Sequence, residues 1–295
     1  MKQSLTYYLL LLVLKLKGVK KDFSQNPIDF KSIRKGDVHT PRPASFAPSK
    51  AATFKVAEST ITEVKGANAS KGLILFVHGG AFISGPTDLH WDTIKKITAK
   101  TGQTVWLCDY PKAPENQMET ISKNIDLVYE RALEEYLANK ITLLGDSVGG
   151  TLTTALTQRL IHQNQKPPCK LILVSPVMDA SMSNPKIEEV DARDPMLSKA
   201  GVLSAKKMCA GNLDLKDAII SPIYGSFNGF PKTVLFLAEN DITYPDQQLA
   251  VKKMEAEGVE VEVILGENMP HIWPLLPVMK EANVALTQLI NRLEN

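Results

Sequence analysis

The order of apolar and helical segments after residue 51 constrains the fold of this chain most strongly. Short runs rich in leucine and β-branched residues occur at residues 73–77, 104–108, 141–144, 171–174, 233–237 and 259–265. Longer segments with helical spacing lie between or after them, at residues 91–101, 118–139, 149–164, 246–258 and 274–293. Runs that are apolar along their whole length are typical of strands covered on both faces. The alternation predicts an α/β fold with a mostly parallel, doubly wound sheet.

Other segments depart from this alternation. Residues 54–64 alternate apolar and polar side chains, which predicts one half-buried antiparallel strand. Residues 179–225 show weak helical patterning and no strand pattern, which predicts an insertion. Leucines and lysines between residues 5 and 21 predict a helix with a basic end, and the Pro-rich and Ser-rich residues 41–50 predict a linker. We therefore expect the regular domain to begin near Ala51.

The net charge argues against several classes of partner. The chain has 295 residues, with 34 Lys and Arg against 32 Asp and Glu, so its formal net charge is +2. This balance gives no indication of a nucleic-acid partner or a strongly charged substrate. Hydrophobic residues make up 44% of the chain, as in ordinary globular proteins, which excludes disordered and collagen-like classes.

Three cysteines, Cys108, Cys169 and Cys209, stand far apart and form no CxxC pair. An odd number with this spacing indicates neither a disulfide framework nor a zinc site, so we expect reduced thiols. Cys108 and Cys169 lie in or beside apolar runs, where a free cysteine usually behaves as a small buried hydrophobe.

The longest apolar run near the start, from Tyr7 to Leu14, is much shorter than the ~20 residues that span a bilayer. Lys15 and Lys17 follow it, and no small-residue cleavage site precedes Lys20, so the pattern does not match a signal peptide. We therefore expect a cytoplasmic protein without stable membrane insertion.

Residues 145–149, Gly-Asp-Ser-Val-Gly, match the pattern G-x-S-x-G. They follow the apolar run 141–144 directly and precede a helical segment, which is the strand-to-helix context in which this pattern presents a nucleophilic serine. The turn holds the serine in a strained conformation, and side chains at the flanking glycines would collide. We predict that Ser147 is a nucleophile.

A serine hydroxyl needs a base within hydrogen-bond reach, usually a histidine held by a carboxylate. His271 lies in a loop between the last predicted strand and the last predicted helix, and we predict that it is this base. Three other histidines lie in polar surroundings or far along the helix that follows Ser147, namely His39, His90 and His162.

Asp241 follows the strand predicted at residues 233–237, and we predict that it orients His271. Glu239 and Asp246 are the competing carboxylates. The chain order Ser147, Asp241, His271 is the order that hydrolases with a G-x-S-x-G elbow use.

Acyl transfer also needs donors for the negative oxygen of the tetrahedral intermediate. Glycines after the predicted strand 73–77 let the backbone approach a substrate, so we predict donors in the N–H groups of Gly79, Gly80 and Val148. His78 is expected to shape this loop. A phosphate-binding loop is excluded because no Gly-Lys-Ser/Thr or G-x-G-x-x-G follows.

Several ordered motifs resemble the hormone-sensitive-lipase branch of the α/β-hydrolase esterases. The resemblance covers roughly residue 70 to the C-terminus. The motifs are HGGAF at 78–82, DYPKAPE at 109–115, GDSVGG at 145–150, DPMLS at 194–198, SPIY at 221–224 and MPH at 269–271.

The resemblance implies a carboxylic-ester hydrolase without a metal or organic cofactor, acting on small to medium acyl esters. The nucleophile, acid and base of that family fall on Ser147, Asp241 and His271. It also implies a helical cap made of residues 1–50 and about 179–220, on a catalytic domain of residues 51–295. Ala81 replaces a common third glycine and Val148 a common alanine, so acyl-chain preference is the property most affected.

Alternatives remain at this stage. An amidase or peptidase would use the same triad, and a binding protein on a hydrolase scaffold would normally have lost its base. A membrane-surface lipase would use the leucine-lysine helix, but its lysines cluster at one end instead of lining one face. The sequence leaves homo-oligomerisation open.

Overall fold

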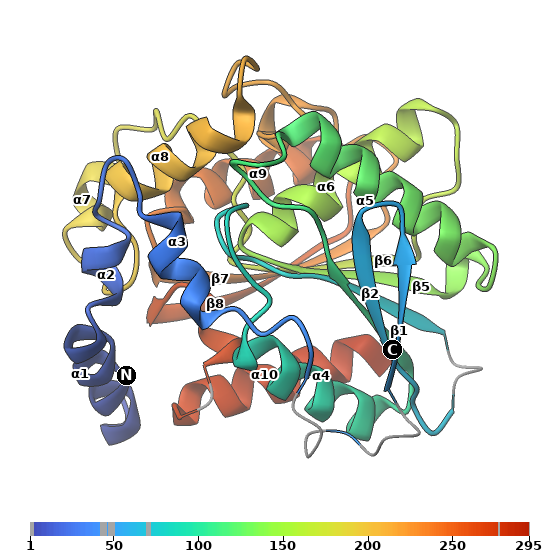
Figure 1. The fold of residues 1–295 in the computed structure, drawn as a ribbon, viewed down its shortest axis with the longest axis horizontal. Helices are drawn as coiled ribbons and strands as arrows, with labels where there is room; N and C mark the ends of the chain where they lie inside the picture. Colours follow the sequence, from blue (N-terminus) through green and yellow to red (C-terminus); the bar gives the residue numbers. More distant parts are fainter. Residues whose placement is uncertain (1–2, 42–45, 47–50, 69–71, 277, 295) are drawn as a thin grey trace.

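The structure, a computed structural model, describes residues 3–41, 46, 51–68, 72–276 and 278–294. Its eight strands are β1 (Ala51–Val56), β2 (Ser59–Val64), β3 (Leu73–Val77), β4 (Thr104–Asp109), β5 (Ile141–Asp146), β6 (Lys170–Val174), β7 (Lys232–Asn240) and β8 (Val261–Pro270). They form one sheet in the order β1-β2-β4-β3-β5-β6-β7-β8 (Figure 1). β2 pairs antiparallel with β1 and β4, and all other neighbours are parallel. The predicted α/β fold is therefore confirmed.

Helices cover both faces of this sheet. They are α4 (Asp88–Thr101), α5 (Met118–Leu133), α6 (Val148–His162), α9 (Tyr244–Ala256) and α10 (Lys280–Glu294), with short 3-10 turns η5 (Ala138–Lys140) and η7 (Trp273–Leu275). In Figure 1, α5, α6 and α9 lie above the sheet, whereas α4 and α10 lie below it. Leu75 and Val77 of β3 join one buried cluster, and Ile74 and Phe76 join the other. Because β3 is buried on both faces, its sequence is apolar without alternation.

The antiparallel start of the sheet differs from its prediction. One strand was expected over residues 54–64, whereas β1 and β2 form a hairpin that turns at Ala57 and Glu58. Ala57 adopts φ 49°, a left-handed conformation that alanine seldom takes. The sequence pattern missed this turn because neither residue is the Gly or Asn that usually marks a two-residue hairpin.

Two segments far apart in the sequence pack together. The first precedes β1 and contains α1 (Leu5–Lys17), α2 (Val19–Asp22), α3 (Phe30–Ile33) and η1 (Arg34–Gly36). The second lies between β6 and β7 and contains α7 (Ile187–Asp191), α8 (Lys199–Ala210) and η6 (Pro222–Tyr224). The N–H of Ile28 donates to Ser204 Oγ (3.0 Å), and Lys20 Nζ donates to the Asp194 carbonyl (2.8 Å). As expected, residues 179–225 contain no strand.

Cysteine burial follows the prediction at one position and departs from it at another. Cys108 is a buried free thiol in β4, whereas Cys169 is exposed. The expectation for Cys169 was wrong because this residue precedes β6 and lies at the rim of the sheet instead of within it. Among the described residues, no helix is both long enough and apolar enough to cross a bilayer.

Candidate active site

Ser147 lies in the turn between β5 and α6. Its φ and ψ are 52° and −123°, a strained conformation for a residue other than glycine. Its N–H donates to the Val174 carbonyl (2.9 Å), and its own carbonyl accepts from the N–H of Val177 (3.1 Å). A Cβ at Gly149 would lie 2.0 Å from the Val77 carbonyl oxygen, so only glycine fits there. The neighbouring strands therefore hold the turn in place.

His271 and Asp241 meet because β7 and β8 pair again at their ends, after an irregularity in the ladder beyond Ala238. β7 ends at Asn240 and β8 ends at Pro270, and these two residues are partners in the parallel ladder. Asp241 and His271, the residues that directly follow these two, are therefore brought side by side. Nδ1 of His271 lies 2.7 Å from Oδ2 of Asp241, and both residues are buried.

The remaining oxygen of Asp241 is also bound. Oδ1 accepts from the N–H of Thr243 (2.8 Å) and from its hydroxyl (2.7 Å). Burial alone would raise the pKa of Asp241, but His271 and Thr243 outweigh it and hold this pKa below its usual value. Burial would likewise lower the pKa of His271, and Asp241 outweighs it, so the pKa of His271 is raised above 6.5. The pair is thus arranged to stabilise a protonated imidazole.

A short chain of hydrogen bonds connects the turn at Ser147 to the loop of His271. Val174, whose carbonyl accepts from Ser147, is followed by Ser175. The hydroxyl of Ser175 accepts from the N–H of Ile272, the residue after His271 (3.0 Å). The structure thus brings Ser147, Asp241 and His271 to the carboxyl ends of three strands, β5, β7 and β8, the usual place for a ligand in an open α/β sheet.

The competing carboxylates have other partners. Oε2 of Glu239 accepts from the N–H of Asn268 (2.9 Å), and Oδ1 of Asp246 accepts from the side chain of Asn184 (2.8 Å). Of the three candidates, Asp241 is the one that contacts His271.

The loop after β3 lies against the turn that carries Ser147. A Cβ at Gly79 would lie 2.4 Å from Asp146 Oδ2 and 2.9 Å from Ser147 Cβ, so the close approach requires glycine. The N–H of Gly79 donates to Asp146 Oδ1 (3.0 Å). This N–H is therefore engaged within the protein, in contrast to its expected role as a donor to the substrate.

Three other N–H groups in this loop and at the start of α6 are available to bind a substrate oxygen. In the described part of the chain, the N–H groups of Gly80, Ala81 and Val148 donate to no other group. Val148 begins α6, and the first N–H groups of a helix have no partner within it. Ala81 adopts φ 54°, which continues the irregular path of the loop.

His78 shapes this loop, as expected. Its Nδ1 lies 2.6 Å from the Gly79 carbonyl, and its ring stacks on Tyr110 at 4.6 Å between centroids. Burial, followed by the positive charge of Lys112, lowers the pKa of His78 to about 4. A histidine with this pKa stays neutral near pH 7 and donates a constant hydrogen bond.

His90 was missed by the sequence analysis. It was assigned to polar surroundings, yet it is only 4% exposed. Nδ1 accepts from the N–H of Thr87 (2.9 Å), so the proton on this ring lies on Nε2. Nε2 lies 3.4 Å from Oδ1 of Asp146, the oxygen that also binds Gly79. The sequence did contain one indication that His90 lies near the site, because His90 falls in the first turn of α4, the helix after the glycine-rich loop.

Asp194 was part of the motif DPMLS, but its role was not anticipated. Oδ1 accepts from the N–H groups of Met196 and Leu197, and Oδ2 accepts from the N–H of Ile242 (2.9 Å). Ile242 follows Asp241, so Asp194 joins the insertion to the loop of the carboxylate. Burial and the charge of Asp241 raise the pKa of Asp194 to about 7.

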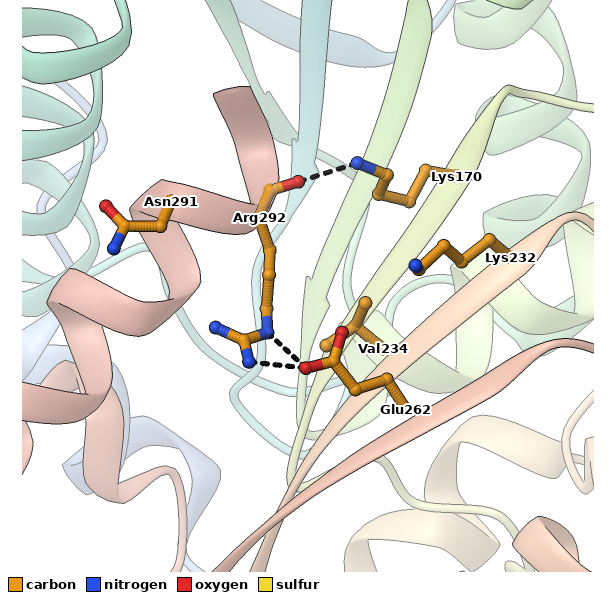
Figure 2. A pocket seen from close by; sticks show the side chains of 6 residues that line it. All are labelled: Lys170, Lys232, Val234, Glu262, Asn291 and Arg292. Atoms are coloured by element: carbon orange, nitrogen blue, oxygen red, sulfur yellow. Dashed lines mark hydrogen bonds and ion pairs between the residues drawn. The ribbon is translucent and has the colours of Figure 1, made fainter. Parts of the chain in front are cut away.

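A second charged region lies at the opposite edge of the sheet, where β6 and β7 begin (Figure 2). Figure 2 shows Arg292 turned toward Glu262, with which it forms an ion pair, and Lys170 Nζ donating to the Arg292 carbonyl (2.7 Å). The cavity has a volume of about 320 Å³ and contains no serine, histidine or cysteine; its lining residues are Lys170, Lys232, Val234, Glu262, Asn291 and Arg292. Within the described residues, no cluster of three His, Cys, Asp or Glu side chains could hold a metal ion.

The chain is similar in sequence and fold to proteins described as esterases and lipases. The sequence pattern of the family described as alpha/beta hydrolase fold matches residues 74–275. An esterase of Acinetobacter venetianus is 29% identical over 212 residues, covering 70% of this chain and 69% of that protein. A triacylglycerol lipase of Mycobacterium tuberculosis is 25% identical over 218 residues, covering 74% of this chain and 45% of that protein. A solved esterase from the bacterial hormone-sensitive lipase family superposes with a TM-score of 0.88 at 20% identity, over 100% of this chain and 99% of the other.

Proposed function

The chain belongs to the α/β-hydrolase fold family, and from this premise we propose that it is a serine carboxylic-ester hydrolase for small to medium acyl esters. The observation that carries the proposal is the strained turn of Ser147 at the same sheet edge as the 2.7 Å pair of His271 and Asp241. The esterase and lipase relatives support the reaction class.

The proposed reaction has two steps. Because Nδ1 of His271 faces Asp241, Nε2 is the nitrogen that takes the proton of Ser147. The serine oxygen attacks the ester carbonyl, and the alcohol leaves after protonation by His271. Water then attacks the acyl-enzyme by the same route and releases the acid. Asp241 orients the imidazole and stabilises its cation without taking a proton.

Backbone N–H groups stabilise the oxyanion in this proposal. Gly80 and Val148 remain the proposed donors, and Ala81 joins them because its N–H is also free within the described residues. Gly79 takes a different part, since its N–H fixes the loop to Asp146. Loss of one such donor typically costs about 10²- to 10³-fold in kcat.

We also propose that residues 1–50 and about 179–220 form a cap over this site. The hydrogen bonds from Ile28 to Ser204 and from Lys20 to Asp194 support a single cap built from both segments. Ser147 is 7% exposed and His271 is 4% exposed, which agrees with a covered site that admits small acyl groups.

Ser147→Ala tests the proposal. The variant should lose hydrolysis of p-nitrophenyl acetate by several orders of magnitude while its thermal unfolding stays near that of the natural chain. Retained hydrolysis would contradict the assignment of the nucleophile. Matched p-nitrophenyl ester and p-nitroanilide substrates separate an esterase from an amidase, and we expect turnover of the ester alone.

A further inference from the structure

The outer side of α1 carries an apolar surface that the proposed reaction does not use. Tyr7, Leu10 and Leu14 are buried on the inner side of the helix. Large apolar side chains on the outer side are exposed to water, up to 88% for Leu5. We call these six residues the outer stripe: Leu5, Tyr8, Leu9, Leu12, Val13 and Leu16.

The spacing of the outer stripe forms one continuous face. Its members recur three or four residues apart, which places them along one side of a helix. In Figure 1, α1 lies at the margin of the molecule, away from the sheet. Soluble proteins rarely expose a contiguous apolar face of this kind without a partner that covers it.

Charge indicates what the partner is. Lys15 and Lys17 are exposed in the last turn of α1, and Lys21 is exposed in α2. α1 itself contains no Asp or Glu, so a second copy of this helix would supply no opposite charge. Leucines beside lysines that form no ion pair with any described residue suit a surface with an apolar interior and anionic head groups.

The position of α1 relates this surface to the proposed active site. The hydroxyl of Tyr7 donates to the Asn268 carbonyl (2.9 Å), three residues before His271. The hydroxyl of Ser4 donates to Glu281 at the start of α10 (2.8 Å). These bonds fix α1 beside the loop that carries His271, so a surface bound by α1 lies near the site.

We propose that the outer stripe and the lysines at its end dock the protein on an anionic lipid bilayer. The leucines enter the interfacial region, and Lys15, Lys17 and Lys21 contact the acidic head groups. The structure supplies what the lysine spacing alone does not, namely which side of the helix the fold leaves uncovered. Docking of this kind is reversible and needs no helix that spans the bilayer.

Vesicle cosedimentation of the full chain tests the proposal. Dialkyl ether phospholipids have no ester to hydrolyse, so binding is measured independently of the proposed reaction. We expect binding to vesicles of ether-linked phosphatidylcholine with 30% ether-linked phosphatidylglycerol, and much weaker binding to phosphatidylcholine alone. Leu9→Ser with Leu12→Ser and Leu16→Ser should weaken partitioning at least about 100-fold, because each leucine contributes apolar area.

Two further variants give the matched comparisons. Lys15→Gln with Lys17→Gln and Lys21→Gln should weaken binding to the acidic vesicles about 100-fold, since one lysine near an anionic surface is worth about fivefold. The control, Leu137→Ser with Leu249→Ser and Val284→Ser, removes exposed apolar side chains on other elements and should bind as the natural chain does.

Three results would overturn the proposal. The natural chain could bind acidic and neutral vesicles equally, or it could bind neither. The third is unchanged vesicle binding by the leucine variant together with a lower mass in light scattering, which would make the outer stripe a contact between copies. Hydrolysis of p-nitrophenyl acetate by the leucine variant should remain within twofold, so a failure of docking is distinct from a failure of the proposed reaction.

Discussion

Two buried histidines in this molecule acquire opposite properties from their surroundings. His271 faces Asp241 at 2.7 Å, and its pKa is raised above 6.5. His78 is also withdrawn from water, but Lys112 and His90 add to the effect of burial and its pKa falls to about 4. Burial acts in the same direction on both imidazoles, so the neighbouring charges decide the sign.

The difference suits His271 to its proposed role as a proton acceptor and His78 to the role of a fixed donor. A base must change protonation during the reaction, and it works best with a pKa near the operating pH. His271 meets this requirement because Asp241 stabilises its cation. His78 does not, and its unchanging hydrogen bond to the Gly79 carbonyl suits a residue that holds a loop in one shape.

The largest test of this difference is Asp241→Asn. The variant should lose about 10⁴-fold in kcat, the size of effect typical of this change in a serine triad. The matched control is Glu239→Gln, which keeps an acceptor for the N–H of Asn268 and should change kcat less than twofold. A loss below tenfold in Asp241→Asn would contradict the proposed triad.

The same variant changes the pH profile in a defined direction. In the proposed reaction His271 acts only when neutral, so kcat/KM of the natural chain should fall as the pH drops through a value above 6.5. Without the charge of Asp241, burial dominates and lowers the pKa of His271. The acid limb of the residual activity should then lie at a lower pH than in the natural chain.

Gly79→Ala should have the next largest effect. The new Cβ would meet Asp146 Oδ2 at 2.4 Å and Ser147 Cβ at 2.9 Å, so the loop must move away from the turn. A displaced loop moves the proposed donors, and we expect kcat to fall about 10²- to 10³-fold with a smaller change in KM. Gly36→Ala is the control because a Cβ there meets nothing within 4 Å, and full activity is expected.

These contacts show how far the sequence determines the site. β3, β5 and β6 could be predicted because each contains a short run of four or five mostly apolar residues, and such a run between helical segments has few alternatives to a buried strand. The positions of Ser147, Asp241 and His271 followed from strand ends, since parallel strands place their carboxyl ends at one edge. Both inferences use local pattern and topology alone.

Other features depend on contacts between distant residues. The engagement of the Gly79 N–H by Asp146 and the approach of His90 to that carboxylate join residues more than 50 positions apart. No local pattern encodes a specific pairing of this kind. The exposed side of α1 was unpredictable for the same reason, because leucines surround the helix and only packing selects the buried ones.

His90→Gln should have a moderate effect. Nε2 of His90 lies 3.4 Å from the Asp146 oxygen that anchors Gly79, so its removal takes a polar neighbour away from this buried carboxylate. We expect kcat to fall about tenfold, which is less than the about 10²- to 10³-fold typical of losing a donor outright. His162→Gln, at the exposed end of α6, should leave kcat unchanged. Equal kcat values for the two variants would remove His90 from the support of the loop.

The smallest expected effect is that of Lys112→Gln, which tests why the pKa of His78 is low. Lys112 Nζ contacts Asp109 Oδ1 at 2.5 Å, and that oxygen is also 3.9 Å from Nε2 of His78. Lys112→Gln removes a positive charge and leaves Asp109 free to favour a protonated His78, so its pKa should rise from about 4 by about one unit. Histidine side-chain NMR measures this change, with the resonance of His271 as the internal control. An unchanged pKa of His78 would mean that burial, and not the charge of Lys112, sets its low value.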